Sequence, residues 1–124
     1  MIVKIGEREI EMHYSLRMYM IYENIVGESV DYTKVLCNNF TSTLNLFYSA
    51  VISSMQYHKM EIDLKFDEFI DWIDTEGKLV IPEFLEWYFG NLKLEQELVG
   101  KATETTEKNK KKSDKKGKPL KNVK

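Results

Sequence analysis

Hydrophobic residues almost disappear from the sequence after Gly100, and this limits the part of the chain that can form a core. Residues 101–124 are mostly Lys, Thr, Glu and Asn. Ordering the backbone costs roughly 1–2 kcal/mol per residue, which such a segment cannot offset by burying apolar surface. The sequence therefore predicts one compact domain over residues 1–99 and a disordered, lysine-rich tail over residues 100–124.

Charge separates the same two parts of the chain. Through Gly100 there are 17 acidic residues against 8 basic ones, a formal charge of −9. Residues 101–124 hold 10 lysines against three acidic residues, a formal charge of +7. The near-neutral total of −2 thus combines an acidic body with a basic tail, an asymmetry that often marks an interaction tail.

Three further features bear on the cellular compartment. The only cysteine is Cys37, so an internal disulfide is excluded. The first residues lack the basic start and apolar run of a secretory signal. No apolar stretch approaches the roughly 20 residues that a membrane-spanning helix needs. We expect a soluble, intracellular protein that does not bind a membrane.

The start of the chain has the pattern of a β-hairpin. Ile10 and Met12 alternate with glutamates, as in a half-buried strand, and Gly6 supplies the positive φ of a tight turn between residues 2–5 and 8–12. An isolated hairpin is only marginally stable in water. We therefore expect it to pack on the segments that follow.

About four helices are predicted after the hairpin, which makes the fold α+β and mostly α. They span residues 15–26, 42–57, 65–74 and 82–98, with Ser15 as the first N-cap, Gly27 as its C′ residue and Pro82 in the last helix's first turn. Residues 28–40 are ambiguous, with a short helix around Tyr32–Leu36 as one interpretation. Together these helices would form a small bundle.

The helical faces indicate which residues form the core. The 42–57 helix repeats apolar residues at core-facing spacing, and its back carries small ones that let another helix approach. The inward set is Leu44, Phe47, Tyr48, Val51, Ile52 and Met55, and the small set is Ser49, Ala50 and Ser53. In the 65–74 helix, Phe66, Phe69, Ile70 and Ile73 face inward while Asp67, Glu68, Asp71 and Asp74 face out.

The last helix has more apolar surface than one core can use. Its apolar residues cover an arc of about 220°, against the roughly 100° stripe of a surface helix. Either the helix lies between two layers, or Trp87, Leu94 and Leu98 face a partner. For the aromatic cluster of Trp72, Trp87, Tyr88 and Phe89, core packing is the main interpretation, although Trp and Tyr also anchor interfaces.

No pattern in the sequence indicates an enzyme, a metal site or a cofactor. His13, Cys37 and His58 lie far apart without ligand spacing. The residues around Asp74 do not fit the calcium-binding loop of an EF-hand, because Trp72 would occupy the first ligand position. Every glycine is isolated, so no phosphate-binding loop is present.

The lysine-rich tail is the remaining candidate for binding. Its lysines could hold phosphates or an acidic protein surface, and the tail lacks the arginines and aromatic rings that read or stack on bases. The candidate partner-binding lysines are Lys110, Lys111, Lys112, Lys115 and Lys116. Binding of nucleic acid through this tail is an alternative function.

The order of these pieces resembles the small tail assembly chaperones of long-tailed bacteriophages and prophages. In that family a strand pair precedes a helix with a Y/F-E-x-x-x-G motif, which is matched here by Tyr22, Glu23 and Gly27. The family's "deF-dwiD" helix is matched at Asp67, Phe69, Asp71, Trp72 and Asp74. The resemblance covers about residues 1–98.

The resemblance implies a non-enzymatic protein that binds the tape measure protein, keeps it soluble and helps to recruit tail tube subunits. Self-association is possible as well. It implies action in the cytoplasm of the bacterial host and absence from the mature virion. Members of the family are often also made in a longer, frameshifted form, of which this chain would be the short counterpart. A minor structural tail or connector protein is a further alternative.

Overall fold

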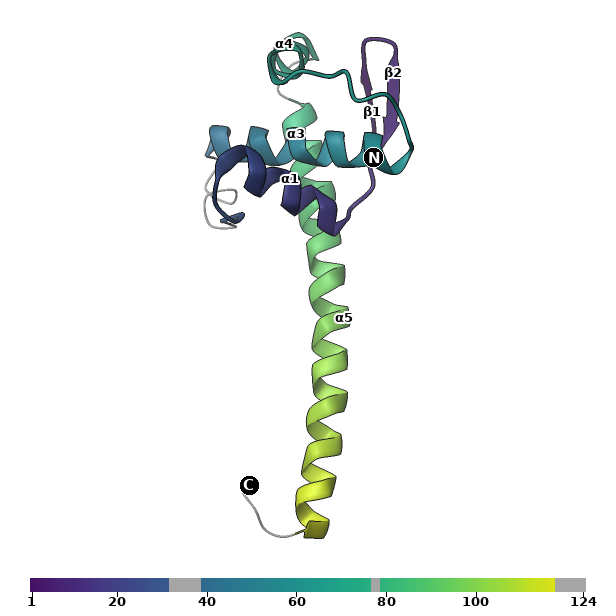
Figure 1. Ribbon diagram of the computed structural model, residues 1–124, viewed down its shortest axis with the longest axis vertical. Helices are drawn as coiled ribbons and strands as arrows, with labels where there is room; N and C mark the ends of the chain where they lie inside the picture. Colours follow the sequence, from purple (N-terminus) through teal and green to yellow (C-terminus); the bar gives the residue numbers. More distant parts are fainter. Residues whose placement is uncertain (32–38, 77–78, 118–124) are drawn as a thin grey trace. The chain divides into compact units, whose positions relative to one another are not determined.

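An antiparallel hairpin opens the chain, and helices joined by loops follow it in the described residues (Figure 1). This computed structural model describes residues 1–31, 39–76 and 79–117, with side chains described as far as Leu98. The chain forms two units, Met1–Tyr88 and Phe89–Lys124, and each is described by itself. The predicted α+β, mostly helical fold with an N-terminal hairpin is confirmed.

The hairpin consists of β1 (Ile2–Ile5) and β2 (Arg8–Glu11), paired in the register Val3 opposite Ile10. Gly6 in the connecting turn has a φ of 64°, a left-handed conformation that costs a residue without a side chain little. Alternate residues are buried, so one face of the hairpin packs on the helices. The predicted strand pattern and turn are both confirmed.

Helix α1 (Leu16–Val26) ends as the sequence predicts. Gly27 adopts a φ of 89°, and its N–H donates to the carbonyl of Glu23 at 2.7 Å, which closes the helix. Ser15 is the N-cap residue, but its hydroxyl makes no capping bond and lies instead 2.9 Å from the hydroxyl of Ser53. The predicted N-cap position is correct, while the side chain joins α1 to the next described helix.

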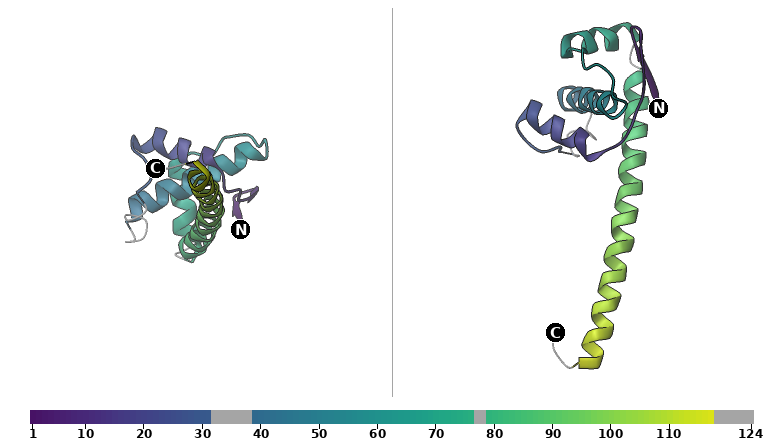
Figure 2. Two further views of the ribbon diagram at one scale, coloured as in Figure 1. Left: turned by 90° about the horizontal axis from the view of Figure 1, so that it is seen from below. Right: turned by 45° about the vertical axis from the view of Figure 1, so that its right-hand side comes forward.

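Helix α3 (Phe40–Tyr57) is the central element of the first unit. Viewed nearly along its axis, it lies between α1 and α4 (Figure 2). The small residues Ser49, Ala50 and Ser53 are buried, as expected for a face that another helix approaches. Burial on both faces explains why this helix is apolar over more than one stripe.

Two buried serines of α3 satisfy their hydroxyl groups within the helix. Ser49 Oγ donates to the carbonyl of Asn45 at 2.7 Å, and Ser54 Oγ donates to that of Ala50 at 2.8 Å. Ser54 Oγ also accepts the backbone N–H of His13 at 2.8 Å. These two serine hydroxyls therefore cost little in the core, because each is hydrogen-bonded.

Helix α4 (Phe66–Glu76) and the first turns of α5 (Val80–Gly117) complete the core of the first unit. The ring of Phe47 stacks on that of Phe84, with centroids 4.3 Å apart, and meets Phe69 edge-on at 5.1 Å. The predicted acidic face of α4 is exposed throughout. Phe66, predicted to face inward, is 37% exposed, because it lies at the margin where its ring meets Tyr48.

The backbone of α5 continues to Gly117, later than the end near Leu98 that the sequence predicts. The predicted helix ended near Leu98 because apolar residues become rare after it. Lys, Glu and Ala are nevertheless good helix formers, so the local propensity permits a helix there. The disorder expected for residues 100–124 in isolation stays a prediction. The proposed helix around Tyr32–Leu36 and the residues Cys37 and Gly77 lie outside the described residues.

Candidate partner-binding surfaces

The three apolar residues predicted to face a partner differ in their surroundings. Trp87, in the first unit, is half-buried, with its ring centroid 6.1 Å from that of Tyr14 and 5.8 Å from that of Phe84. In the second unit, Leu94 is 60% and Leu98 70% exposed. The two leucines thus have the exposure that binding requires, whereas part of Trp87 serves packing. Binding by any of them stays a prediction.

The predicted lysine cluster is described only by its backbone. Lys110, Lys111, Lys112, Lys115 and Lys116 fall within the bounds of α5, and their side chains lie outside the described ones. The proposal that they contact a partner therefore rests on sequence and charge alone.

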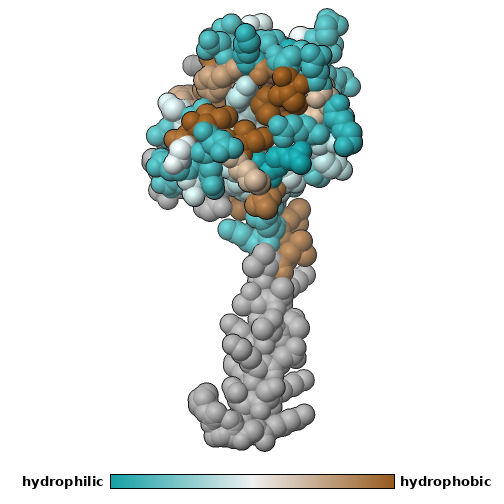
Figure 3. All heavy atoms as spheres, viewed as in Figure 1, coloured by the Kyte–Doolittle hydropathy of each residue, from teal (hydrophilic) through white to brown (hydrophobic). Residues whose placement is uncertain are grey.

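Sequence patterns missed an apolar surface on the outer face of α1. Leu16 is 74% and Met20 59% exposed, and they lie one turn apart on the side of the helix opposite the buried Met18 and Tyr22. Figure 3 shows apolar patches set among hydrophilic side chains on the first unit. The i, i+4 spacing of Leu16 and Met20 is visible in the sequence. The sequence does not show that these two side chains face solvent.

A pocket of about 220 Å³ lies beside the start of α1. Its lining residues are His13, Ser15, Leu16, Arg17, Ser53 and Tyr57. The ring of His13 stacks on that of Tyr57, with centroids 3.6 Å apart, and the two serine hydroxyls face each other. The histidine ring is thus held in place by stacking on an aromatic ring.

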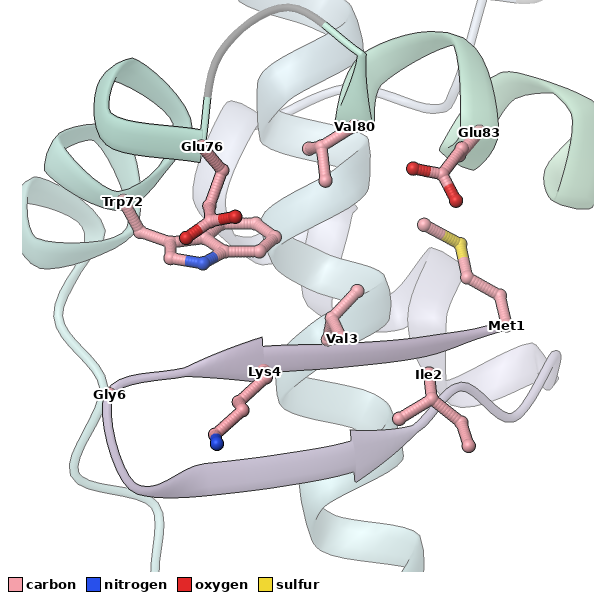
Figure 4. Close-up of a pocket in the computed structure, with 9 residues that line it drawn as sticks. All are labelled: Met1, Ile2, Val3, Lys4, Gly6, Trp72, Glu76, Val80 and Glu83. Atoms are coloured by element: carbon pink, nitrogen blue, oxygen red, sulfur yellow. The ribbon is translucent and has the colours of Figure 1, made fainter.

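A larger pocket, of about 430 Å³, lies between the hairpin and the ends of α4 and α5 that face it (Figure 4). Strand β1 forms one wall, and Trp72, Glu76, Val80 and Glu83 form the other. Trp72 is 9% exposed, and its indole nitrogen has no hydrogen-bond partner among the residues that the structure describes. A buried N–H without an acceptor is unusual in a folded protein and needs an explanation.

Arg8 ties the hairpin to the segment before α4 and to α4 itself. Its Nε donates to Asp63 Oδ1 at 2.9 Å, and its Nη1 donates to Glu68 Oε2 at 3.0 Å. The hydrogen bond from Arg8 is the main cause that holds the pKa of the Asp63 carboxyl below its usual value. The same bond raises the pKa of the Arg8 guanidinium. Elsewhere, burial raises the pKa of Tyr48, whose hydroxyl donates to the carbonyl of Leu64.

We expect the contribution of Asp63 to stability to depend on pH. Its pKa is lower in the folded chain, so the stabilisation is complete above the unfolded value of about 3.9 and is lost as the pH falls through the folded value. Urea unfolding should therefore show Asp63→Asn to be less stable than the parent at neutral pH, with the difference shrinking below about pH 4. Glu61→Gln is the matched control, because the described residues include no ion-pair partner for Glu61. A difference that is constant with pH would contradict the assignment.

The two histidines make separate contacts. His13 stacks on Tyr57, and His58 Nε2 lies 2.8 Å from the backbone carbonyl of Glu11. Within the described ranges, no three His, Cys, Asp or Glu side chains lie together as a metal site would require. No helix in the described part of the chain has the length and apolarity to cross a membrane.

Comparisons of the chain with protein-family models, with curated proteins and with solved structures find no match. The fold and its surfaces are therefore the basis for the functional proposals that follow.

Proposed function

We propose that this chain is an assembly chaperone of a long-tailed phage or prophage, which binds the tape measure protein without catalysing a reaction. Its action in the host cytoplasm, its recruitment of tail tube subunits and its absence from the mature virion belong to the same proposal. The observation that carries it is the apolar surface left exposed on helices, Leu16 and Met20 on α1 and Leu94 and Leu98 on α5. A protein that keeps an apolar, helical client soluble needs such surface.

The positions of the resembling motifs also support the proposal. Tyr22 is a buried residue of α1, and Glu23 and Gly27 form the hydrogen bond that closes that helix. In α4, Phe69 and Trp72 are buried while the matched acidic residues are exposed. Most of the matched apolar residues therefore occupy core or helix-end positions. A resemblance at such positions concerns the fold more than a binding site.

Co-expression with the tape measure protein of the same phage tests the proposal. We expect the client's soluble fraction to rise and the two proteins to co-purify. The double variant Leu16→Ser with Met20→Ser should recover at least about tenfold less client, because it removes two apolar side chains from the contact. Leu79→Ser, a change at an exposed leucine before α5, is the matched control.

A client that stays insoluble, with no co-purification, would contradict the chaperone proposal. Mass spectrometry of mature particles gives a second measurement, since a chaperone should be missing from them. Detection of the chain at stoichiometric levels in particles would instead favour a structural tail protein.

A further inference from the structure

The outward-facing backbone groups of β1 follow from the hydrogen bonds of the hairpin. The N–H of Met12 donates to the carbonyl of Met1 at 2.8 Å, which makes these two a hydrogen-bonded pair. Such pairs alternate with non-bonded ones along an antiparallel ladder. Ile2 and Lys4, each one residue from a bonded position, therefore direct their N–H and C=O groups away from β2.

The two edges of the hairpin differ in how they are covered. On β2, the outward carbonyl of Glu11 is contacted by His58 Nε2, and the side chain of Arg8 holds the strand to Asp63 and Glu68. The outward groups of Glu9, like those of β1, have no hydrogen bond within the described residues, so His58 is what separates the two edges. On β1, no hydrogen bond to the outward groups of Ile2 or Lys4 is recorded within the described residues. An uncovered strand edge is a template on which another strand can pair.

The larger pocket lies beside β1 and is lined on this side by Met1, Ile2, Val3, Lys4 and Gly6. Figure 4 shows the side chains of Val3 and Val80 pointing toward each other across the space, and that of Lys4 pointing away from it. An added strand would thus meet backbone groups on one side and apolar side chains beyond them. This combination is the one used by domains that bind peptides by strand addition.

Trp72 supplies a second, independent indication of a ligand. It is about nine-tenths buried and lines the pocket, and within the described part of the chain its indole N–H has no acceptor. Figure 4 shows the indole nitrogen on the side of the ring that faces β1. A peptide carbonyl on a strand added to β1 would provide the missing acceptor.

Charge on the helical wall indicates which peptide fits. Glu76, at the end of α4, and Glu83, in the first turn of α5, both line the pocket. In Figure 4 the two carboxylates lie on the helical side of the space, opposite the strand. Met1 also lines the pocket, and its side chain points toward Glu83, while the Lys4 side chain points away. The carboxylates of Glu76 and Glu83 are thus the charged side chains that face the space, and they favour a basic residue on the bound peptide.

We propose that the edge of β1 binds an extended peptide of a partner protein by strand addition. The peptide pairs with the backbone of Ile2 and Lys4, accepts a hydrogen bond from Trp72, and places a lysine or arginine near Glu76 and Glu83. This inference does not rest on the proposed function, and it holds for any partner with such a segment.

The test uses the full purified chain and two synthetic hexapeptides of alternating valine and threonine, one with lysine and one with glutamate at each end. Binding is followed by NMR, through amide hydrogen exchange and the indole N–H signal of Trp72. The lysine peptide should slow exchange of the Ile2 and Lys4 amides and shift the Trp72 signal. The glutamate peptide should bind at least about tenfold more weakly.

Proline substitution separates the two edges of the hairpin. Lys4→Pro removes an outward N–H of β1 without removing a ladder hydrogen bond, and it should weaken binding of the lysine peptide at least about tenfold. Glu9→Pro is the matched control, because Glu9 pairs with Lys4 and directs its N–H to the opposite edge. Slow exchange of the Val3 amide, which faces β2, verifies in each variant that the hairpin remains paired.

Side-chain variants test the rest of the groove. Trp72→Phe keeps an aromatic ring but removes the N–H, and should weaken binding about five-fold. Glu76→Gln with Glu83→Gln should reduce the preference for the lysine peptide and its dependence on salt.

Three outcomes would overturn the proposal. They are absence of protection at Ile2 and Lys4 with the lysine peptide, equal binding by Lys4→Pro and the parent, and protection that grows with protein concentration in the absence of peptide. The last would mean that a second copy of the chain occupies the edge. Because no phage protein is used, failure here leaves the co-expression test unaffected.

Discussion

Replacing Phe47 by alanine should lower the free energy of unfolding by about 3–5 kcal/mol, the range for removing a buried phenylalanine. The side chain is fully buried in α3, where it meets rings from α4 and the start of α5. Its centroid lies 4.3 Å from that of Phe84 with the planes nearly parallel, and 6.0 Å from that of Trp72.

Such a loss is a large share of the total stability, since domains of this size are stable by only about 5–15 kcal/mol. We expect the melting temperature to fall by more than about 10 °C. Urea unfolding followed by circular dichroism gives the free energy. Phe40→Ala is the matched control on the same helix, because Phe40 is 61% exposed and its loss should cost within about 0.5 kcal/mol.

The stacked pair can be measured separately with a double-mutant cycle. Phe47→Ala and Phe84→Ala should show a coupling of about 0.5–1.5 kcal/mol beyond the sum of their single effects, because the rings contact each other directly. Additive effects would contradict a direct stabilising contact between the two rings. A Phe47→Ala variant as stable as Phe40→Ala would contradict the conclusion that the Phe47 ring stabilises the core.

Local sequence signals predicted the parts of the fold that depend on neighbours in the chain. The turn at Gly6, the helix end at Gly27 and the apolar spacing of α3 each involve residues only a few positions apart. The cap of α3 was missed. Asn39 accepts the N–H of Ser42 with its side chain, but it follows a segment without clear periodicity.

The candidate binding surfaces could not be predicted in the same way. Whether Leu16 and Met20 face solvent depends on which side of α1 meets α3, and a pattern with apolar residues on both sides does not decide that. The difference between the two edges of the hairpin depends on contacts of β2 with the end of α3 and the segment after it, where His58 lies beside the Glu11 carbonyl and Asp63 accepts from Arg8. These features depend on tertiary contacts between residues about 50 positions apart in the chain.

Three tyrosines form another long-range feature that sequence patterns did not indicate. The hydroxyl of Tyr19, on α1, is hydrogen-bonded to that of Tyr14 and lies 3.2 Å from that of Tyr88, on α5. Tyr88 is fully buried, and its ring stacks near that of Phe84 with centroids 6.0 Å apart. The three hydroxyls thus connect the segment before α1, α1 itself and the start of α5.

Tyr88→Ala should therefore lower the free energy of unfolding by about 3–5 kcal/mol, because it removes a buried ring with all its contacts. Tyr88→Phe should cost only about 1 kcal/mol, the usual net value of one hydrogen bond. Tyr19 keeps Tyr14 as a partner in that variant, so no hydroxyl of the pair becomes isolated. Urea unfolding of the two variants measures both values.

The comparison between these variants separates ring packing from hydrogen bonding in holding α5 to α1 within the first unit. If the ring dominates, Tyr88→Phe stays close to the parent and only Tyr88→Ala loses stability. If the two variants lost equal amounts, the hydroxyl would be the essential group, since the phenyl ring is retained in one of them. The geometry favours the first result, because the ring meets Phe84, Tyr14 and Tyr19 while its hydroxyl makes a long bond of 3.2 Å.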